Sequence, residues 1–441
     1  MAETQGSTLK QRVFGSGSWA LAGHVISQAL RFGGNLILTR LLFPEAFGMM
    51  TLVTALMVGA TMMTDIGIAP GVVRDPRGGE PDFLHTAWVL QIAHGTLVAV
   101  AMCALAMPAA AYFNQPEIAP LILAAALVPF LTGFSSIKLV LALRNVQTRS
   151  LVIMDIGVQI ASLLLMAGFA WWHASAWALV WGNVLGALVR VVASHLLLDG
   201  MRDKFKFDRV VVRSLLHFGG WVTLSSILTF AAGEGSKLVA GSMLSLKTIA
   251  LFGIANGLGG LLMQAIQTIV GRSLFPAYAE VVRLGDMHRL RRMVQRARVV
   301  QVLAGVASSA IFILMGPWLV HLLYDDRYIG AGRILQIVAV GQMLGLLVAS
   351  YTGVLWALSR IGLSSLLLAI QTVVTWLCMA VGNAGWGETG VIWGVAAANL
   401  VAYPFHAYAY HRLGLYEWRI DVPVLLFSAA TVAYLTQVLW T

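Results

Sequence analysis

The feature that most constrains this sequence is a series of apolar runs, each long enough to cross a lipid bilayer. A membrane-spanning helix needs about 20 mostly apolar residues. Charged residues make up only 11% of the 441 residues, whereas a soluble domain carries about 25%. The sequence therefore predicts an all-α integral membrane protein with 12 core transmembrane helices, at 13–42, 46–68, 84–113, 117–143, 150–172, 176–198, 214–243, 248–274, 294–324, 332–357, 361–383 and 387–411, and a thirteenth at 422–440.

The basic residues predict which way these helices cross the membrane. Lysine and arginine are enriched in the cytoplasmic loops of membrane proteins. With the N-terminus in the cytoplasm, most of the 29 Lys and Arg residues fall on inner loops, and only Arg40, Lys247, Arg327 and Arg333 fall on the outer side. We therefore expect residues 1–12 to form an uncleaved cytoplasmic tail. The same bias explains the net charge of +10 without nucleic acid as a partner.

Two basic segments stand out on the predicted cytoplasmic side, Met201–Arg213 and Pro276–Arg298. Both could be amphipathic helices lying on the cytoplasmic leaflet. The alternative is that they are ordinary loops whose charge only reflects membrane orientation.

The first predicted helix carries a stripe of polar residues. His24, Gln28, Arg31 and Asn35 are spaced by four, three and four residues, which places them on one face of an α-helix. Polar residues at membrane depth face protein or a water-filled cavity and mark functional sites. Arg31 is therefore a candidate substrate contact; the alternatives are that it caps backbone carbonyls or pairs with an acid on another helix.

The segment containing this stripe recurs later in the chain. At an offset of 202 residues, Ser18–Leu42 aligns without a gap with Gly220–Leu244, and Asn35 aligns with Lys237. A parallel repeat relates two halves by an axis along the membrane normal. We expect two pseudo-symmetric six-helix lobes around a central polar cavity, with residues 13–200 as the N-terminal lobe, 201–213 as a basic cytoplasmic linker, 214–412 as the C-terminal lobe and 421–441 as an additional hydrophobic helix.

The second half supplies further candidate cavity residues. Lys237 follows Glu234 by three residues, so the two either neutralise each other or divide their roles, with Lys237 on an anionic substrate and Glu234 accepting a coupling proton. Arg272 lies eight residues after Gln264 in the eighth predicted helix; the alternative is that Arg272 extends to the cytoplasmic interface. Cations outnumber acids among these residues, which favours a phosphate or pyrophosphate ligand.

Other intramembrane charges have competing interpretations. Asp155 is a possible ion carrier or a partner for Arg144, and Asp65 is either an ion-coupling residue or part of a turn. For Arg190 and Lys138 we expect side chains that extend to the interface. The two cysteines lie in apolar runs and predict neither a disulfide nor a metal site, and no motif indicates a cofactor.

Several stretches resemble a known family of transporters. LTRLLFPEAFGMMTLVTAL at 38–56 and TDIGIAPGVVR at 64–74 resemble the signature of the polysaccharide transporters, the Wzx-type oligosaccharide flippases of the multidrug/oligosaccharidyl-lipid/polysaccharide (MOP) flippase superfamily. LHFGGWVTLSSILTF at 216–230 and GRSLFPAYAEV at 271–281 are similar to the pattern of the family's second lobe. Family members usually have 12 or 14 helices, so the thirteenth run departs from the pattern.

The resemblance implies a V-shaped cavity, alternating access and a bacterial inner-membrane location. It implies a flippase, not an enzyme, that moves undecaprenyl-pyrophosphate-linked oligosaccharide to the periplasmic leaflet for exopolysaccharide, capsule or O-antigen synthesis. Partners would be this lipid-linked glycan, membrane lipids and polysaccharide polymerase or synthase components. The family's cavity cations carry over to Arg31, Lys237 and Arg272.

Two other functions compete with this interpretation. A cation-coupled multidrug or small-molecule exporter of the same superfold predicts acids in the first-lobe cavity, which the sequence does not show. A membrane-embedded glycosyl- or acyltransferase would need paired carboxylates or a histidine base at an outer loop. Asp325 and Asp326 are the candidate pair, and a polar turn is the alternative for them.

Overall fold

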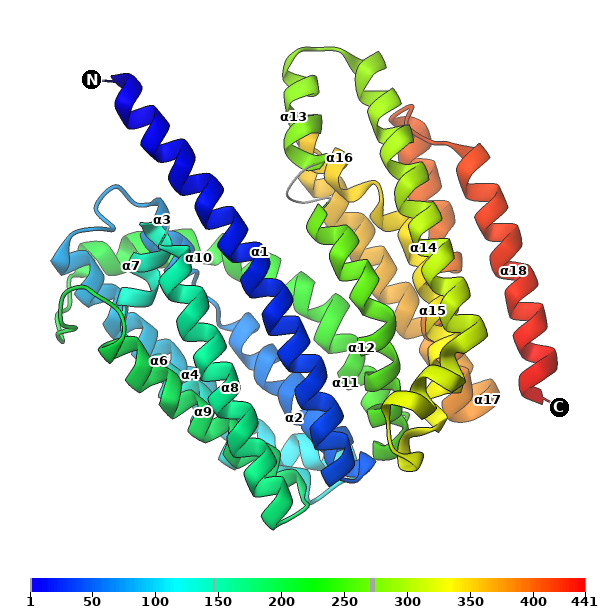
Figure 1. Cartoon of the computed structure of the whole chain (residues 1–441), viewed down its shortest axis with the longest axis horizontal. Coiled ribbons are helices and arrows are strands. Elements are labelled where there is room, and N and C mark those ends of the chain that lie inside the picture. The colour runs from blue at the N-terminus through cyan, green and yellow to red at the C-terminus, as the bar shows by residue number, and fades with distance from the viewer. Residues whose placement is uncertain (1, 146, 270–273, 441) are drawn as a thin grey trace. The chain divides into compact units, whose positions relative to one another are not determined.

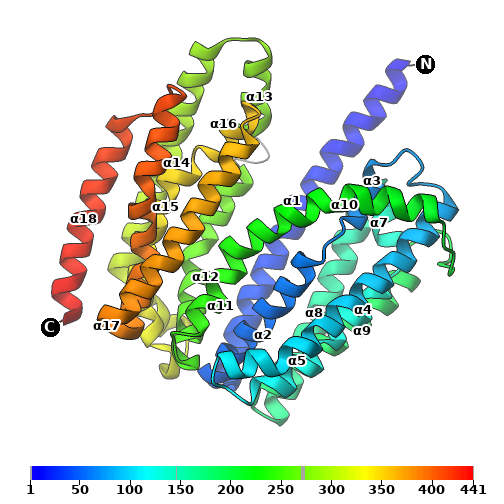
Figure 2. The ribbon, with the colours of Figure 1, turned by 180° about the vertical axis from the view of Figure 1, so that it is seen from behind.

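The computed structural model describes residues 2–145, 147–269 and 274–440, and these residues form helices with no β-strand among them. The chain divides into two compact units, Met1–Phe230 (unit 1) and Ala231–Thr441 (unit 2). Figures 1 and 2 show the helices of each unit from opposite sides. The predicted all-α class is confirmed, and the boundary between the units lies inside the predicted seventh helix.

Unit 1 contains ten helices among its described residues, the longest being α1 and α4. Their bounds are α1 (Ala2–Leu41), α2 (Pro44–Met63), α3 (Ile68–Arg74), α4 (Pro81–Tyr112), α5 (Ile118–Ala125), α6 (Leu127–Gly133), α7 (Lys138–Arg144), α8 (Thr148–Trp172), α9 (Ala176–Leu196) and α10 (Arg209–Phe230).

Unit 2 begins with a π-helical turn and contains the long helix α17. Its elements are η1 (Ala231–Gly235), α11 (Ser236–Gly241), α12 (Leu246–Ile269), α13 (Phe275–Arg283), α14 (Met287–Leu323), η3 (Asp326–Tyr328), α15 (Gly330–Ala349), α16 (Thr352–Ala357), α17 (Ile361–Arg412) and α18 (Trp418–Trp440). Helix α15 packs against α12, α14, α17 and α18 and forms the centre of this unit.

The predicted number of transmembrane helices stays a prediction. Among the described residues, eight helices are long and apolar enough to span a membrane, or nine if one bent pair counts as a span. The thirteenth run is helical as α18, and residues Trp418–Leu435 satisfy the criterion for a span.

The single helix predicted at 117–143 is wrong. The chain bends by 60° between Ile118–Gly133 and Lys138–Arg144. The residues at the break, Ser135 and Ser136, bond through their backbone to side chains of other helices, which replace the hydrogen bonds that a continuous helix would supply.

Helix α17 is two antiparallel helices joined by a tight turn. Trp386 and Gly387 have non-helical backbone angles, and Gly387 has a positive φ of 60°. Gly382 before the turn lies against Gly390 after it. The absence of side chains at both positions lets the two backbones touch, as small residues do between membrane helices. The two helices predicted at 361–383 and 387–411 are therefore present.

The first basic segment is not a separate amphipathic helix, and the second is divided between the short helix α13 and the start of α14. Residues 201–208 form no helix, and 209–213 are the first turns of α10. In the second segment, α13 ends at Arg283 and α14 begins at Met287, with the Asp286 carboxylate accepting a hydrogen bond of 2.8 Å from the Arg289 N–H. That cap starts the long helix α14 inside the basic cluster.

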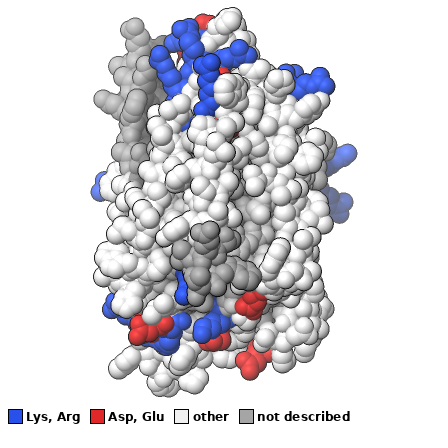
Figure 3. All heavy atoms as spheres, turned by 90° about the vertical axis from the view of Figure 1, so that its right-hand side faces the viewer, with Lys and Arg blue, Asp and Glu red and all other residues white. Residues whose placement is uncertain are grey.

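On the face drawn in Figure 3, charge is distributed as expected for a bilayer-spanning protein. Figure 3 shows Lys and Arg gathered at one end of the face drawn, acidic and basic residues mixed at the other end, and mostly uncharged side chains between. Water-facing ends separated by an uncharged band are the arrangement that a hydrocarbon layer requires.

Candidate functional site

The polar stripe of α1 lies beside the face that packs on α8. Ser27 bonds with Gln159 of α8, whose side-chain N–H donates to the Ser27 carbonyl oxygen at 2.9 Å. Gly34 approaches Leu163 of α8 so closely that a Cβ would overlap it. Because Ser27 and Gly34 face α8, the stripe residues point in other directions around the helix.

Arg31 is the exposed member of the predicted substrate-binding set on α1. Gln28 and Asn35 are half-buried, and His24 is exposed like Arg31. The structure gives the Arg31 guanidinium no hydrogen bond or ion pair with any residue that it describes. A guanidinium with five donors on an apolar helix can bind a phosphate oxygen pair in the bidentate manner.

Lys237 and Glu234 form an ion pair at the start of unit 2. Their Nζ and Oε1 atoms are 2.7 Å apart, and the two side chains are 50% and 26% exposed. Glu234 lies in the π-helical turn η1, a local distortion that occurs frequently at functional sites. The pair has no net charge, so Lys237 contributes less positive potential than its sequence position predicts, and its role as a substrate contact stays a prediction.

The eighth predicted helix is described only in part. Gln264 is exposed on α12. Arg272 lies outside the described residues, so its role as a cavity cation stays a prediction.

Asp155 pairs with a different arginine from the one proposed for it. Its Oδ1 atom accepts a hydrogen bond of 2.9 Å from Arg190 of the neighbouring helix α9. Arg144 instead donates to backbone carbonyl oxygens at the end of α3, including that of Val73 at 3.1 Å. The pairing of Asp155 with Arg144 is therefore wrong, because α8 and α9 pack together and bring Asp155 to Arg190. The expected position of the Arg190 side chain at the membrane interface stays a prediction.

Asp65 lies in a polar cluster at the end of α2. Its Oδ1 accepts from the Gly67 N–H at 2.8 Å and its Oδ2 from the Ser226 hydroxyl at 3.4 Å. Gly67 has a φ of 62°, so this is the turn chemistry that the sequence offered as one alternative. Next to it, Thr64 and His94 contact each other at 3.1 Å. His94 was not identified from the sequence, and the ion-coupling role of Asp65 stays a prediction.

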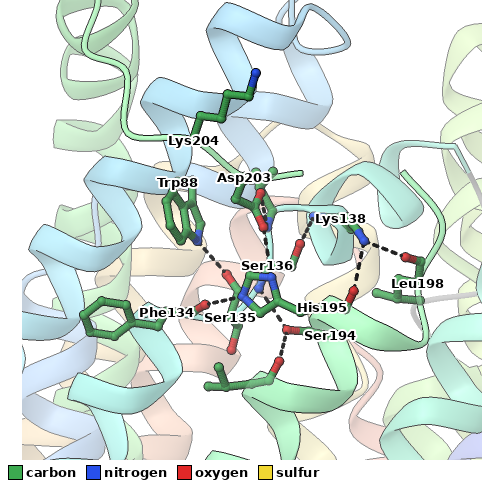
Figure 4. A network of polar contacts seen from close by, with 12 residues as sticks. Trp88, Phe134, Ser135, Ser136, Lys138, Ser194, His195, Leu198, Asp203 and Lys204 are labelled. Atoms are coloured by element: carbon green, nitrogen blue, oxygen red, sulfur yellow. Dashed lines mark hydrogen bonds and ion pairs between the residues drawn. The ribbon is translucent and has the colours of Figure 1, made fainter. Parts of the chain in front are cut away.

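The break between α6 and α7 is held by side chains from other segments (Figure 4). The indole N–H of Trp88 in α4 donates to the Ser135 carbonyl oxygen at 3.1 Å. The Ser194 hydroxyl oxygen of α9 accepts from the Ser136 N–H at 2.9 Å. Backbone groups that a helix break leaves unpaired are thus satisfied inside unit 1.

Lys138 caps the C-terminus of α9, and its expected extension to the membrane interface stays a prediction. Its Nζ donates to the carbonyl oxygens of His195 and Leu198 at 3.0 and 2.9 Å, at the C-terminus of α9 (Figure 4). The last carbonyl oxygens of a helix have no partner within that helix, and the Lys138 ammonium supplies the hydrogen bonds that they lack. Asp203, from the linker, accepts from the Ile137 N–H at 3.4 Å and lies 3.4 Å from the His195 ring, so it fastens the linker to the same place.

A buried ion pair in unit 2 was missed by the sequence reasoning. Arg298, counted there among the cytoplasmic loop cations, is 0% exposed, and its Nη2 lies 2.7 Å from the Asp421 Oδ1 atom. Its Nε donates to the Ser350 hydroxyl at 2.9 Å, and the guanidinium lies 3.8 Å from the centre of the Tyr351 ring. Tyr403 donates to the other Asp421 oxygen at 2.7 Å. The network joins α18 to α14, α15 and α17.

Asp325 forms the polar turn that was the alternative to a catalytic role. It accepts from the Arg327 N–H at 3.1 Å and pairs with the Arg327 side chain at 3.0 Å. The same contact raises the pKa of the Arg327 guanidinium above its usual range. A carboxylate held in this way is engaged in loop structure.

Comparisons with known sequences point to glycan export. A family model described as polysaccharide biosynthesis protein matches residues 37–332. The chain is 24% identical over 406 residues to the lipopolysaccharide biosynthesis protein WzxC of Escherichia coli, which covers 89% of this chain and 80% of that protein. It is 24% identical over 331 residues to the succinoglycan biosynthesis transport protein ExoT of Rhizobium meliloti, covering 74% of this chain and 65% of that protein's length.

Solved structures share the fold. A multidrug resistance MATE family transporter of the MOP superfamily in an inward-facing conformation aligns with a TM-score of 0.71 at 15% identity, over 90% of this chain and 95% of that one. The lipid II flippase MurJ, in an inward closed conformation, aligns with a TM-score of 0.65 at 12% identity, over 95% of this chain and 92% of that one. At these identities the likeness concerns architecture alone.

Proposed function

The chain belongs to the polysaccharide biosynthesis protein family, and on that premise we propose that it is a flippase for a lipid-linked oligosaccharide. The names of the two relatives support this, since one is a lipopolysaccharide biosynthesis protein and the other a succinoglycan transport protein. The observation in the chain that best supports it is Arg31, an exposed guanidinium within the polar stripe of α1.

The ligand we propose is undecaprenyl-pyrophosphate-linked oligosaccharide, moved from the cytoplasmic to the periplasmic leaflet. Its pyrophosphate would bind Arg31, with Lys237, Arg272 and the amides of Gln28, Asn35 and Gln264 completing the contacts. Pyrophosphate matches a guanidinium through paired charge-assisted hydrogen bonds. The glycan would cross through a water-filled cavity between two lobes that alternate in access, while the lipid tail stays in the bilayer.

The cellular setting is part of the same proposal. We place the protein in the bacterial inner membrane with its N-terminus in the cytoplasm, where membrane lipids and the polysaccharide polymerase or synthase would be its partners. It would act as a transporter and not as an enzyme. A proton or sodium ion would reset the cavity, with Glu234, Asp155 and Asp65 as the candidate carriers.

A leaflet assay in the native host tests this function. In a knockout strain we expect undecaprenyl-linked intermediates to accumulate on the cytoplasmic leaflet, measured by their access to a periplasmic enzyme in spheroplasts. Wild-type protein should restore export, and Arg31→Lys should restore it only in part, because an ammonium keeps the charge but not the paired hydrogen bonds. Arg31→Ala at equal protein level should reduce export at least about tenfold, because about 1.5–3 kcal/mol of charge-assisted bonding is lost. Arg40→Ala on the same helix is the matched control. Full export by Arg31→Ala would refute the role of this cation.

A cation-coupled exporter is the second candidate, because a multidrug transporter shares the fold. It predicts normal leaflet distribution of the intermediates in the knockout, together with increased sensitivity to drugs. Measuring both in one strain separates the two functions.

A further inference from the structure

We propose that Arg74, Arg209 and Arg213 form a binding site for the phosphate groups of a lipid headgroup at the end of unit 1 where α3 meets α10. Arg74 is the last residue of α3, and Arg209 is the first residue of α10. The two helices pack together and lie side by side in Figures 1 and 2. The site is thus formed within one unit, on the side that the charge bias assigns to the cytoplasm.

The cations surround two adjoining hollows that share Ser214. One hollow has a volume of about 630 Å³ and is lined by Arg209, Val210, Arg213 and Ser214. The other has a volume of about 240 Å³ and is lined by Gly71, Arg74, Asp75, Pro76, Ser214 and Leu215. Each volume is large enough for a phosphate group, and together they place cations around a site that can hold two.

Two of the three cations, Arg209 and Arg213, carry charge that no described residue neutralises. Arg209 and Arg213 are four residues apart, so they lie on one face of α10, and both are exposed. Neither guanidinium forms a hydrogen bond or ion pair with a residue that the structure describes. Like charges placed this closely on a helix are unfavourable alone and are stabilised by an anion.

The one carboxylate that lines the hollows is already engaged. Asp75 accepts from the Arg77 N–H at 2.9 Å and from the Ser214 hydroxyl at 3.4 Å, and Arg77 Nε lies 3.6 Å from it. Arg144 adds a further positive charge beside it, donating to the Pro76 carbonyl oxygen at 3.2 Å. The surroundings therefore remain cationic, which favours phosphate.

The segment before α10 indicates that the phosphate belongs to a lipid. Phe205 and Phe207 are 75% and 61% exposed and alternate with lysines. Aromatic side chains beside cations are typical of segments that lie in the headgroup region. Contacts of Lys206 with Asp82 at 2.7 Å and of the Asp208 N–H with Thr86 at 3.2 Å hold this segment in place, so the site is preorganised.

Both a phospholipid and a polyprenyl diphosphate present this chemistry. The inference rests on the proposed function only if the ligand is the polyprenyl diphosphate. In that case the site would bind the lipid-linked substrate before it is transported. We would measure binding of farnesyl diphosphate and of phosphatidylglycerol to the full-length protein in nanodiscs. The variants are Arg209→Gln/Arg213→Gln and, as a control of equal charge change in unit 2, Arg289→Gln/Arg292→Gln; an Arg31→Ala background removes the contribution of the first helix.

We expect the Arg209/Arg213 variant to weaken binding about tenfold or more, the effect of losing one charge-assisted hydrogen bond, and the control to bind as wild type does. Loss for farnesyl diphosphate alone identifies a diphosphate lipid, and equal loss for both identifies a general phospholipid site. Unchanged binding of both probes overturns the site. If farnesyl diphosphate fails to bind the wild type while phosphatidylglycerol binding depends on Arg209 and Arg213, the site stands and the proposed flippase function loses its support.

Discussion

Replacing Asp421 by Asn should strongly destabilise unit 2. The Arg298 and Asp421 side chains are 0% and 1% exposed, and the carboxylate accepts from Arg298 and Tyr403, each at 2.7 Å. Removing one partner of a buried pair leaves the other charge uncompensated and costs about 3–5 kcal/mol. At about 2–4 °C per kcal/mol for a body of this size, Tm should fall by roughly 6–20 °C.

The assay is thermal unfolding of the purified protein in detergent, and the chain offers a matched control. Asp155→Asn makes the same chemical change at an ion pair of 2.9 Å whose side chains are 39% and 53% exposed. An exposed pair contributes about 0–1 kcal/mol, so Tm should change by no more than about 4 °C.

A double variant separates the ion pair from simple loss of packing. Arg298→Met/Asp421→Leu removes both charges and should be more stable than Asp421→Asn alone, since apolar replacement of a whole buried pair is often neutral. Two results would refute the reasoning: a Tm for Asp421→Asn that equals that of Asp155→Asn, or a double variant less stable than the single one.

Two further stability predictions follow from backbone contacts. Gly390→Ala should cost about 1–3 kcal/mol, because its Cβ would overlap the Gly382 backbone, whereas Gly385→Ala, with no atom near its Cβ, should be neutral or stabilise by up to about 1 kcal/mol; equal Tm values for the two would contradict this. Lys138→Met should cost about 1–3 kcal/mol because two carbonyl oxygens of α9 lose their donor; the exposed Lys247→Met is its control, and a similar Tm for both would argue against the capping role.

The sequence predicts the parts of this fold that depend on local pattern. Long apolar runs identified the helices, including the pair joined at Gly387, because burial in a bilayer needs only length and hydropathy. Arg298 was counted with the cytoplasmic loops and their flanks because it ends a basic segment, and its partner Asp421 lies 123 residues away. No local pattern reports such a pairing, which arises only when α14 and α18 pack.

The candidate site shows the same division. The polar stripe on α1 could be recognised from helical spacing, and the structure shows Arg31 exposed. Whether the stripe faces a substrate cavity stays a prediction. The partner of Asp155 could not be recognised, because it depends on the packing of α8 against α9. The ion pair of Lys237 with Glu234 was one of two alternatives at a spacing of three residues, and the structure contains it.

Helix α10 follows the linker in sequence but packs on α2, α3 and α4. The chain passes into unit 2 only after Phe230. A split protein made by opening the chain between Lys204 and Lys206 would therefore yield two fragments that interlock, since the second fragment carries the helix that completes the first. The two co-expressed fragments should therefore bind each other through the contacts of α10 with α2, α3 and α4. A split after Phe230 would instead give each fragment the complete set of helices of its own unit.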